Sequence, residues 1–301
     1  MLKKPLVSFI VTSYNYSKYI EKALESIKNQ SYANFEIIIV DDCSEDNSVE
    51  ILEHFIASNQ DLRITLITHD ENKGQLESMI DGLRIAQGVF VSFVDSDDVL
   101  LKDYAKVHTD VHLSASVAFT SSQMIEIDEN DEIHTMYSIS SPHSEQPETI
   151  VNINDILKND IENVKFHKVK NKRFGGWYWS PNSSAMYRKS ALNIILNYKN
   201  PEKWRVCPDK FLFNLMNLIG GSINIEAPLI AYRRHSHNAG GSGHVVGDAK
   251  YPSDKTTLNN IKNNITIRPE TVKFLLSSKS AVVEQFGTRG FIKLLLKAAF
   301  M

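Results

Sequence analysis

The sequence predicts an α/β protein with a doubly wound, mostly parallel sheet that is flanked by helices. Two observations support this fold class. Up to about residue 120, apolar runs typical of buried strands alternate with segments of helical periodicity. Three of the strand-like runs also stop on clusters of polar residues. In open α/β sheets, ligands bind beyond the carboxyl ends of the strands, so these clusters mark one functional edge.

Each element of the first half can be justified from local patterns. Four strands are expected, near 6–12, 35–40, 63–68 and 89–94. Three helices are expected between them, near 17–29, 47–58 and 74–87. The run Ile37 to Val40 is β-branched throughout, as expected for a strand buried on both faces of a parallel sheet. A further strand over 116–121 leads into residues 124–127.

The second half is less regular. Residues 128–172 are polar and include Pro142 and Pro147, which predicts a long excursion or flexible insert. The regular pattern then returns, with helices near 188–198 and 208–219 and a strand near 222–232. We therefore expect one domain over 1–240, divided into halves at residue 127. Residues 241–301 are expected to form a C-terminal, helical extension.

Composition indicates a globular protein with room for one large or two modest domains. The 301 residues are 42% hydrophobic and 23% charged. A net charge of −3 gives no electrostatic footprint for nucleic acid, and no apolar stretch approaches the roughly 18 residues of a spanning helix. Two cysteines, Cys43 and Cys207, suit a reducing cytoplasm. The N-terminus enters a strand at once, so no signal peptide is expected.

The most informative cluster is acidic. The strand near 89–94 runs directly into Asp95, Asp97 and Asp98. Like charges repel and are costly to desolvate unless a cation compensates them, and Mg²⁺ or Mn²⁺ is the usual partner of clustered carboxylates. A polar turn that caps a helix through Tyr104 is the alternative reading.

Two other strand ends favour a binding site. The strand near 35–40 ends at Asp41 and Asp42, and the first strand ends in a polar run that contains Thr12 and Tyr14. Because these strands are predicted to be parallel, all three ends lie on one rim. The sequence therefore predicts a site where a divalent cation binds a phosphorylated substrate.

Three later features contain residues that could bind a ligand or take part in catalysis. An aromatic stretch contains Trp177 and Trp179, which could stack on sugar rings or a base, or could brace a loop. Asp209 precedes an apolar helix and could be a catalytic base or a first-turn acid of that helix. His235 follows a strand terminus with two arginines and could be a metal ligand or part of a solvated basic loop.

Taken together, these motifs resemble the inverting glycosyltransferases of family 2, which have the GT-A fold. The stretches Val7 to Asn15 and Ile39 to Asp46 resemble the family's first strand and second acidic turn. Asn72-Lys-Gly74, Gly88 and Phe93-Val-Asp-Ser-Asp-Asp98 follow in the expected order, the last resembling the DxD motif. The likeness covers about 5–127 densely and 174–238 more thinly. It implies that 1–127 is the nucleotide-binding half and 128–240 the acceptor half.

The resemblance implies a role for each matching residue. The nucleotide-binding set is Thr12, Tyr14, Asp42, Lys73, Gln75 and Asp97, with Asp42 accepting a hydrogen bond from a uracil N–H. The metal set is Asp98 with Asp95 in support and His235 closing the site. Asp209 occupies the position of the general base, although the family's usual Glu-Asp pair reads Pro208-Asp209 here. Trp177 and Trp179 are expected to contact the acceptor or donor sugar.

The implied activity is transfer of a single sugar from a nucleotide diphosphate sugar, a UDP-sugar above all, to a hydroxyl of a glycan or lipid-linked acceptor. The Gln-x-x-Arg-Trp signature of processive members is absent from the sequence, which favours single transfer. Mn²⁺ or Mg²⁺ is the implied cofactor. Two alternatives remain open: a non-catalytic nucleotide-sugar binding protein, and a phosphotransfer or phosphatase-type domain built on Asp41, Asp42 and Asp95.

The location follows from the same reasoning. A cytoplasmic protein is expected, at the inner face of the membrane if the acceptor is lipid-linked. The last residues, 287–301, predict a short basic, apolar helix. Three arrangements are open for this helix: packing on the domain, which is favoured, formation of a homo-oligomer, or peripheral contact with a membrane surface.

Overall fold

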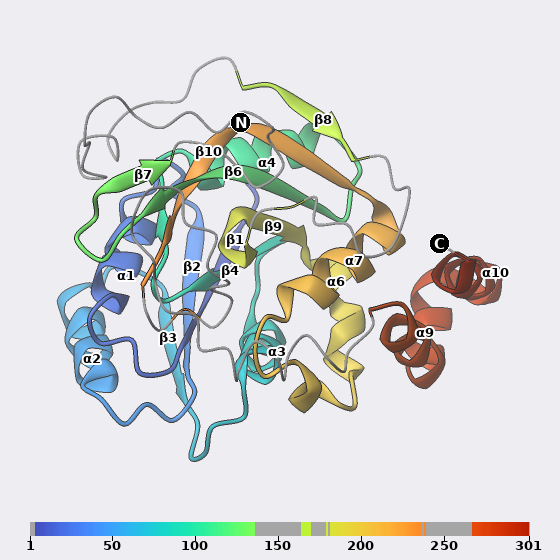
Figure 1. Cartoon of the computed structure of the whole chain (residues 1–301), viewed down its shortest axis with the longest axis horizontal. Helices are drawn as coiled ribbons and strands as arrows, with labels where there is room; N and C mark the ends of the chain where they lie inside the picture. The colour runs from blue at the N-terminus through green and yellow to red at the C-terminus, as the bar shows by residue number, and fades with distance from the viewer. Residues whose placement is uncertain are drawn as a thin grey trace.

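The computed structural model describes residues 4–135, 164–169, 179, 181–235, 238 and 267–300. They form one large mixed sheet with helices on both faces (Figure 1). The strands are β1 (Val7–Ser13), β2 (Phe35–Asp41), β3 (Ile64–Thr68), β4 (Phe90–Asp95), β5 (Val99–Leu100), β6 (Phe119–Ile127), β7 (Ile133–Thr135), β8 (Phe166–Lys168), β9 (Ala185–Arg188) and β10 (Ser222–Arg233).

The sheet has a parallel part and a mixed part. The strand order is β3-β2-β1-β4-β9-β6-β10-β5, with β7 paired to β6 and β8 to β10. Strands β1 to β4 are mutually parallel, as predicted, so their carboxyl ends meet at one edge. Strand β9 runs antiparallel to both β4 and β6, and β6 is parallel to β10. The chain thus returns after residue 180 to insert β9 into the middle of the sheet.

The helices of the domain divide between the two faces. They are α1 (Ile20–Lys28), α2 (Ser48–Ser58), α3 (Gln75–Ile85), α4 (Tyr104–Ser114), α6 (Lys189–Leu192) and α7 (Asp209–Gly220). Helices α1, α2 and α4 share one hydrophobic cluster with the sheet, and α3, α6 and α7 share the other. In β2, Ile37 and Ile39 point into the first cluster while Ile38 and Val40 point into the second. This confirms a strand that is buried on both faces.

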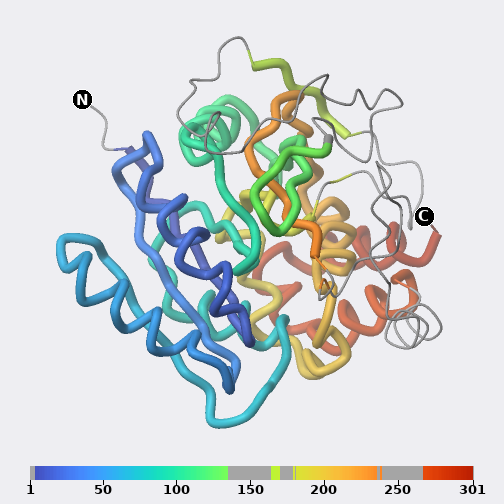
Figure 2. The backbone as a smooth tube through the Cα atoms, turned by 60° about the vertical axis from the view of Figure 1, so that its left-hand side comes forward, coloured from blue at the N-terminus to red at the C-terminus, as the bar shows by residue number. Residues whose placement is uncertain are grey.

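The C-terminal segment is helical, as predicted, over its described residues. Helices α9 (Ile267–Ser277) and α10 (Lys279–Phe300) pack against α7 and lie at one side of the molecule (Figures 1 and 2). Helix α10 is interrupted at Gly287, whose φ of 71° is not helical. Phe274, Val282 and Phe291 belong to the same hydrophobic cluster as α3 and α7. Across the described ranges, no helix is both long enough and apolar enough to cross a bilayer.

Two predicted elements differ from the structure. The helix expected near 188–198 is the end of β9, the single turn α6 and the 3₁₀ segment η2 (Asn193–Asn197). Asparagine and β-branched isoleucine are weak helix formers, which is consistent with this break. Helix α4 was anticipated only as the alternative reading of the acidic turn. The buried face of α4 includes His108 and His112. Because histidine is polar, the sequence does not show the regular spacing of apolar residues that predicts a helix.

Candidate functional site

A cleft of about 930 Å³ lies at the carboxyl ends of β1, β2 and β4. It is also bordered by the loop before α3 and by the segment that leads into α7. Most of the sequence-predicted site residues line it, namely Thr12, Tyr14, Asp42, Gln75, Asp95, Asp97, Asp209 and His235. The expected convergence of three polar strand ends on one rim is therefore present, and the second half of the chain contributes to it.

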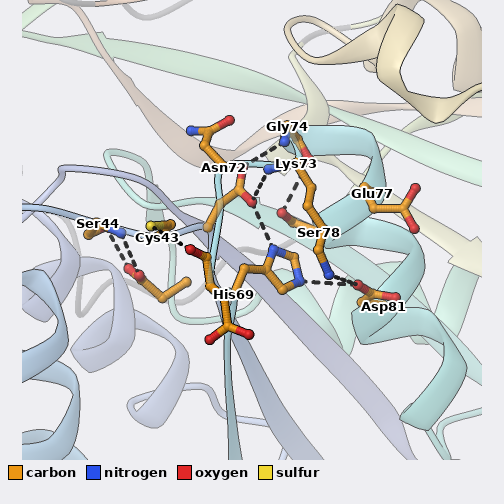
Figure 3. A network of polar contacts seen from close by, with 12 residues as sticks. Cys43, Ser44, His69, Asn72, Lys73, Gly74, Glu77, Ser78 and Asp81 are labelled. Atoms are coloured by element: carbon orange, nitrogen blue, oxygen red, sulfur yellow. Dashed lines mark hydrogen bonds and ion pairs between the residues drawn. The ribbon is translucent and has the colours of Figure 1, made fainter.

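Asp42 directly follows β2 and holds the loop that borders the cleft. Figure 3 labels Lys73 and Gly74 of this loop. One carboxylate oxygen accepts hydrogen bonds from the backbone N–H of Lys73 at 2.8 Å and from Nδ1 of His69 at 2.8 Å. The other accepts from the backbone N–H of Gly74 at 2.7 Å. Asp42 is buried and still lines the cleft. Its carboxylate thus shapes the loop that borders the cleft.

His69 connects this carboxylate to α3. Its Nε2 lies 3.1 Å from Oδ2 of Asp81, so the ring bridges two carboxylates from opposite sides (Figure 3). Lys73, predicted to approach a nucleotide base, points its ammonium toward Asp81 at 3.9 Å. Lys73 is not among the residues that line the cleft. Its backbone N–H, rather than its side chain, faces Asp42.

The loop is held from its other side by the segment that precedes α7. The backbone N–H of Gln75 donates to the carbonyl of Arg205 at 3.0 Å, and the Arg205 guanidinium contacts Asn72. Gly74 has a φ of 94°, and a Cβ at this position would stand 2.7 Å from the Arg205 Cα. The Gln75 side chain donates to Oδ1 of Asp95 at 2.7 Å. The loop therefore joins Asp42, Asp95 and the approach to Asp209.

The acidic turn after β4 does not present all its carboxylates to the cleft. Asp95 and Asp97 line it, but Asp98 does not. Asp98 is completely buried, and its Oδ1 accepts a hydrogen bond from the backbone N–H of Arg233 at 3.1 Å. Burial, together with the negative charges of Asp97 and Asp95, holds the pKa of Asp98 well above its usual range. The prediction that Asp98 ligates a metal ion in this cleft is not supported by its position.

Asp97 and His235 form the pair that faces the cleft instead. His235 Nε2 lies 2.9 Å from Asp97 Oδ2, which also accepts from the side-chain amide of Asn238 at 3.1 Å. The rings of Tyr16 and Tyr19 lie 5.8 and 5.0 Å from the imidazole, between centroids, and help to fix it. An imidazole nitrogen and a carboxylate oxygen that converge in this way are suitable ligands for Mn²⁺.

The described residues do not form a complete metal site by themselves. Within the described ranges, no group of three or more histidine, cysteine, aspartate or glutamate side chains is arranged to hold a metal ion. The predicted set of Asp95, Asp98 and His235 is therefore not assembled. Asp97 and His235 fit a cation whose other ligands come from a substrate and water, as is common for Mg²⁺ at phosphate sites.

Asp209 begins α7 and lies in the same cleft, as its predicted role requires. Its side chain is buried, and its Oδ1 accepts a hydrogen bond from the backbone N–H of Lys210 at 2.8 Å. Burial raises the pKa of Asp209 to about 6. Burial also raises the pKa of Asp95, and the negative charges of Asp97 and Asp209 raise it further. Asp209 is thus an ionised carboxylate near neutral pH with little solvation.

The aromatic prediction fails for Trp179. This residue is 4% exposed and packs against Phe119 and Phe213, with ring centroids 5.6 Å away in both cases. Its indole N–H donates to Oγ of Ser222 at 3.0 Å. A side chain buried in the core cannot stack on a sugar, so Trp179 is a structural residue. Trp177 lies outside the described residues.

Several residues of the cleft were not singled out from the sequence. Asn182 is 2% exposed and lines the cleft, where a side-chain hydrogen bond with Asp95 opposes the rise in the pKa of that carboxyl. Tyr16, Asn238 and Arg205 also line the cleft. Asn182 and Asn238 had a signal in the sequence, because Asn182 lies in the polar run that follows the aromatic stretch and Asn238 ends the polar run that contains His235. The others are positioned by contacts between distant segments.

A cleft at the carboxyl ends of parallel strands is where open α/β proteins bind their ligands, so the fold and the cleft define a ligand-binding α/β protein. The family comparison is more specific. The chain belongs to glycosyl transferase family 2, whose model matches residues 8–195. This confirms the family suggested by the sequence motifs, and it leaves the phosphotransfer alternative without support.

Curated relatives are named as glycosyltransferases. TuaG of Bacillus subtilis, whose name refers to teichuronic acid biosynthesis, is 40% identical over 117 residues, which are 39% of this chain and 46% of TuaG. The Escherichia coli protein named UDP-Glc:alpha-D-GlcNAc-diphosphoundecaprenol beta-1,3-glucosyltransferase WfgD is 34% identical over 115 residues, 38% of this chain and 44% of WfgD. The matches thus span less than half of either relative.

Solved structures show the same fold over nearly the whole chain. Staphylococcus aureus TarS 1–349 in complex with UDP-GlcNAc has a TM-score of 0.55 at 17% identity, with 98% of this chain and 72% of that chain covered. The mannosyltransferase PcManGT of Pyrobaculum calidifontis, in complex with GDP-Man and Mn²⁺, has a TM-score of 0.52 at 14% identity, with 99% and 88% covered. The fold is therefore of the GT-A type, with an added C-terminal helical segment.

Proposed function

We propose that this protein transfers a single sugar, with inversion, from a UDP-sugar to a hydroxyl group of a glycan or lipid-linked acceptor, and that Asp209 is the general base. The observation that carries the proposal is the position of Asp209. Its buried carboxylate lies in one cleft with the strand ends that carry Asp42, Asp95 and Asp97. The name of WfgD, with its UDP-glucose donor and diphosphoundecaprenol acceptor, supports the choice of donor and acceptor classes.

The residues divide between binding and chemistry. Thr12, Tyr14 and the loop held by Asp42 border the part of the cleft assigned to the nucleotide. Asp209 takes the proton of the acceptor hydroxyl as its oxygen attacks the anomeric carbon of the donor sugar. The bond between that carbon and the diphosphate oxygen breaks, and the configuration inverts because attack and departure occur on opposite faces. A pKa of about 6 leaves Asp209 ionised at neutral pH and basic enough for this role.

Asp97 and His235 would hold a divalent cation, Mn²⁺ or Mg²⁺, against the donor diphosphate. When bound, the cation neutralises charge that develops on the leaving diphosphate. Asn238 and the rings of Tyr16 and Tyr19 orient these two ligands. Asp95 lines the same cleft as Asp209 and accepts a hydrogen bond from Gln75.

The variant Asp209→Asn tests the assignment of the base. It keeps the shape of the side chain and removes its basicity, so transfer should slow by about 10²–10⁴-fold while donor affinity stays within a small factor of wild type. In the wild type, the rate should fall as the pH drops through about 6, because Asp209 becomes protonated. Sugar transfer measured over a pH series, together with calorimetry of UDP binding, provides both readouts.

Glu202→Gln is the matched control, because Glu202 is an exposed acid in the same stretch and does not line the cleft. It should transfer sugar at the wild-type rate. A near wild-type rate in Asp209→Asn would remove Asp209 as the base. A wild type that binds donor without turnover, with the same affinity in Asp209→Ala, would instead identify a non-catalytic nucleotide-sugar binding protein.

Binding of UDP should also depend on a divalent cation. A cation would be held by Asp97 and His235 on the protein and by the two phosphates of the nucleotide. Neither the protein nor the nucleotide provides this set of ligands alone. Calorimetry should show tighter UDP binding with Mn²⁺ than with EDTA. The variant His235→Ala should reduce this difference. Equal affinity under both conditions would contradict the metal assignment.

A further inference from the structure

The C-terminal helix α10 presents an apolar row to solvent. Ile292, Leu296 and Phe300 are spaced four residues apart, so they lie along one side of the helix. Their exposed fractions are 50%, 53% and 82%. These three residues, hereafter the apolar row, are among the most exposed large hydrophobic side chains of the described chain. Exposed apolar side chains are common when scattered, but a row on one helix face indicates an interaction surface.

A row of cations runs beside the apolar row. Arg289, Lys293 and Lys297 have the same spacing and are all exposed. No Asp or Glu occurs from Gln285 to Phe300. Lys18 and Lys22, by contrast, each form an ion pair with an acidic residue. Arg289, Lys293 and Lys297, hereafter the basic row, form no ion pair with another described residue. This segment is therefore positive in a chain whose net charge is −3.

The opposite side of the helix fixes its orientation. Phe291, Leu294 and Ala298 are buried, and they belong to the hydrophobic cluster that also contains residues of α7. The helix is thus anchored to the domain by one face and holds the apolar and basic rows outward. It lies at the side of the molecule, beyond α6 and α7 (Figures 1 and 2).

We propose that this face of α10 docks the protein on an anionic lipid surface. Apolar side chains that enter the boundary between headgroups and acyl chains, with adjacent Lys and Arg near anionic headgroups, are the pattern of an interfacial helix. A second copy of the chain fits less well, because pairing this face with itself would bring two sets of cations together. The proposal rests on the proposed function in one respect only: the proposed function gives a reason for docking, which is access to a lipid-linked acceptor.

Vesicle sedimentation of the full chain tests the proposal. The protein should bind vesicles that contain phosphatidylglycerol more tightly than vesicles of phosphatidylcholine, and salt should weaken the binding. Lys293→Gln with Lys297→Gln should lower the partition coefficient about fivefold for each charge removed. Ile292→Ser with Leu296→Ser should lower it about tenfold or more, since both chains would no longer be buried in lipid.

Leu113→Ser is the matched control, because Leu113 is 63% exposed on helix α4, outside the C-terminal segment. It should bind vesicles like the wild type. All the substituted side chains are exposed, so melting temperatures should stay unchanged and report correct folding. Equal binding by wild type and both double variants would overturn the proposal. So would a concentration-dependent dimer that the apolar-row variant abolishes while vesicle binding is absent. Vesicle binding without sugar transfer would uphold the docking surface and count only against the proposed function.

Discussion

At the scale of single residues, Asp42 holds a loop of the cleft, and its carboxylate can also serve the proposed binding of the base. Its oxygens already accept hydrogen bonds from two backbone N–H groups and one imidazole. Because each carboxylate oxygen has two lone pairs, a further donor such as a uracil N–H can still be accepted. The internal bonds fix the direction in which that acceptor points. If Asp42 binds the base as proposed, orientation of the loop and binding of the base are coupled at this residue.

The variant Asp42→Ala should therefore lose both nucleotide affinity and stability. Loss of a charge-assisted hydrogen bond of roughly 1.5–3 kcal/mol predicts at least about tenfold weaker UDP binding. The unpaired N–H groups of Lys73 and Gly74 should lower the free energy of unfolding by about 1–3 kcal/mol. Calorimetry and denaturant unfolding measure the two effects. His69→Ala removes the imidazole that bridges Asp42 and Asp81 but keeps the bonds from Asp42 to the N–H groups of Lys73 and Gly74, so it should weaken UDP binding less. Unchanged UDP affinity in Asp42→Ala would remove Asp42 from the site.

Residue types and their order in the chain predicted which strand ends and side chains meet at one cleft, and side-chain direction limited the prediction. Asp97 and Asp98 are adjacent in one turn, yet one faces the cleft and the other lies under β10. Trp179 is of a residue type that can stack on a sugar, but its ring packs in a cluster with Phe119 and Phe213. These outcomes depend on the packing of strands that are distant in sequence. Asp209 was placed correctly because it starts a strongly apolar helix that must pack on the sheet.

At the scale of elements, the parallel half was predictable because each strand is a β-branched or aromatic run followed by its own helix. The mixed half was not. Strand β9 is only four residues long and pairs with β4 and β6 through long-range contacts. Contacts between the two halves of the chain also position the loop over 72–75. This loop contacts the segment around Arg205, which belongs to the second half. The cleft is therefore a product of how the two halves meet.

The variant Gly74→Ala should disturb this junction. A non-glycine residue with φ of 94° is strained, and the new Cβ would lie 2.7 Å from the Arg205 backbone. We expect weaker UDP binding and a lower melting temperature. Gly287→Ala is the control, because its φ of 71° imposes a backbone penalty while no atom lies within 4 Å of the new Cβ. Only Gly74→Ala should impair binding. Equal UDP affinity in the two variants would mean that the contact does not shape the site.

At the scale of the whole molecule, the buried histidines of α4 make stability depend on pH. Burial lowers the pKa of His112 to about 4, and it holds the pKa of His108 well below the usual range, with the nearby His112 adding to the effect. His112 stacks on Phe90 at 4.7 Å and donates from Nε2 to the carbonyl of Met186 at 2.9 Å. Both rings therefore stay neutral inside the fold at pH values where they would be charged in the unfolded chain.

The sign of the effect follows from proton binding. Between pH 6.5 and 4 the unfolded chain binds more protons at His112 than the folded one, so the free energy of unfolding falls as the pH falls. One group contributes about 1.4 kcal/mol for each pH unit, or roughly 3 kcal/mol over this window. His112→Gln keeps an N–H donor for the Met186 carbonyl and cannot titrate. Its free energy of unfolding, measured in denaturant at several pH values, should fall less steeply than that of the wild type. His54→Gln, a change at an exposed histidine, should leave the slope unchanged; parallel wild-type and His112→Gln curves would show that His112 does not govern acid stability.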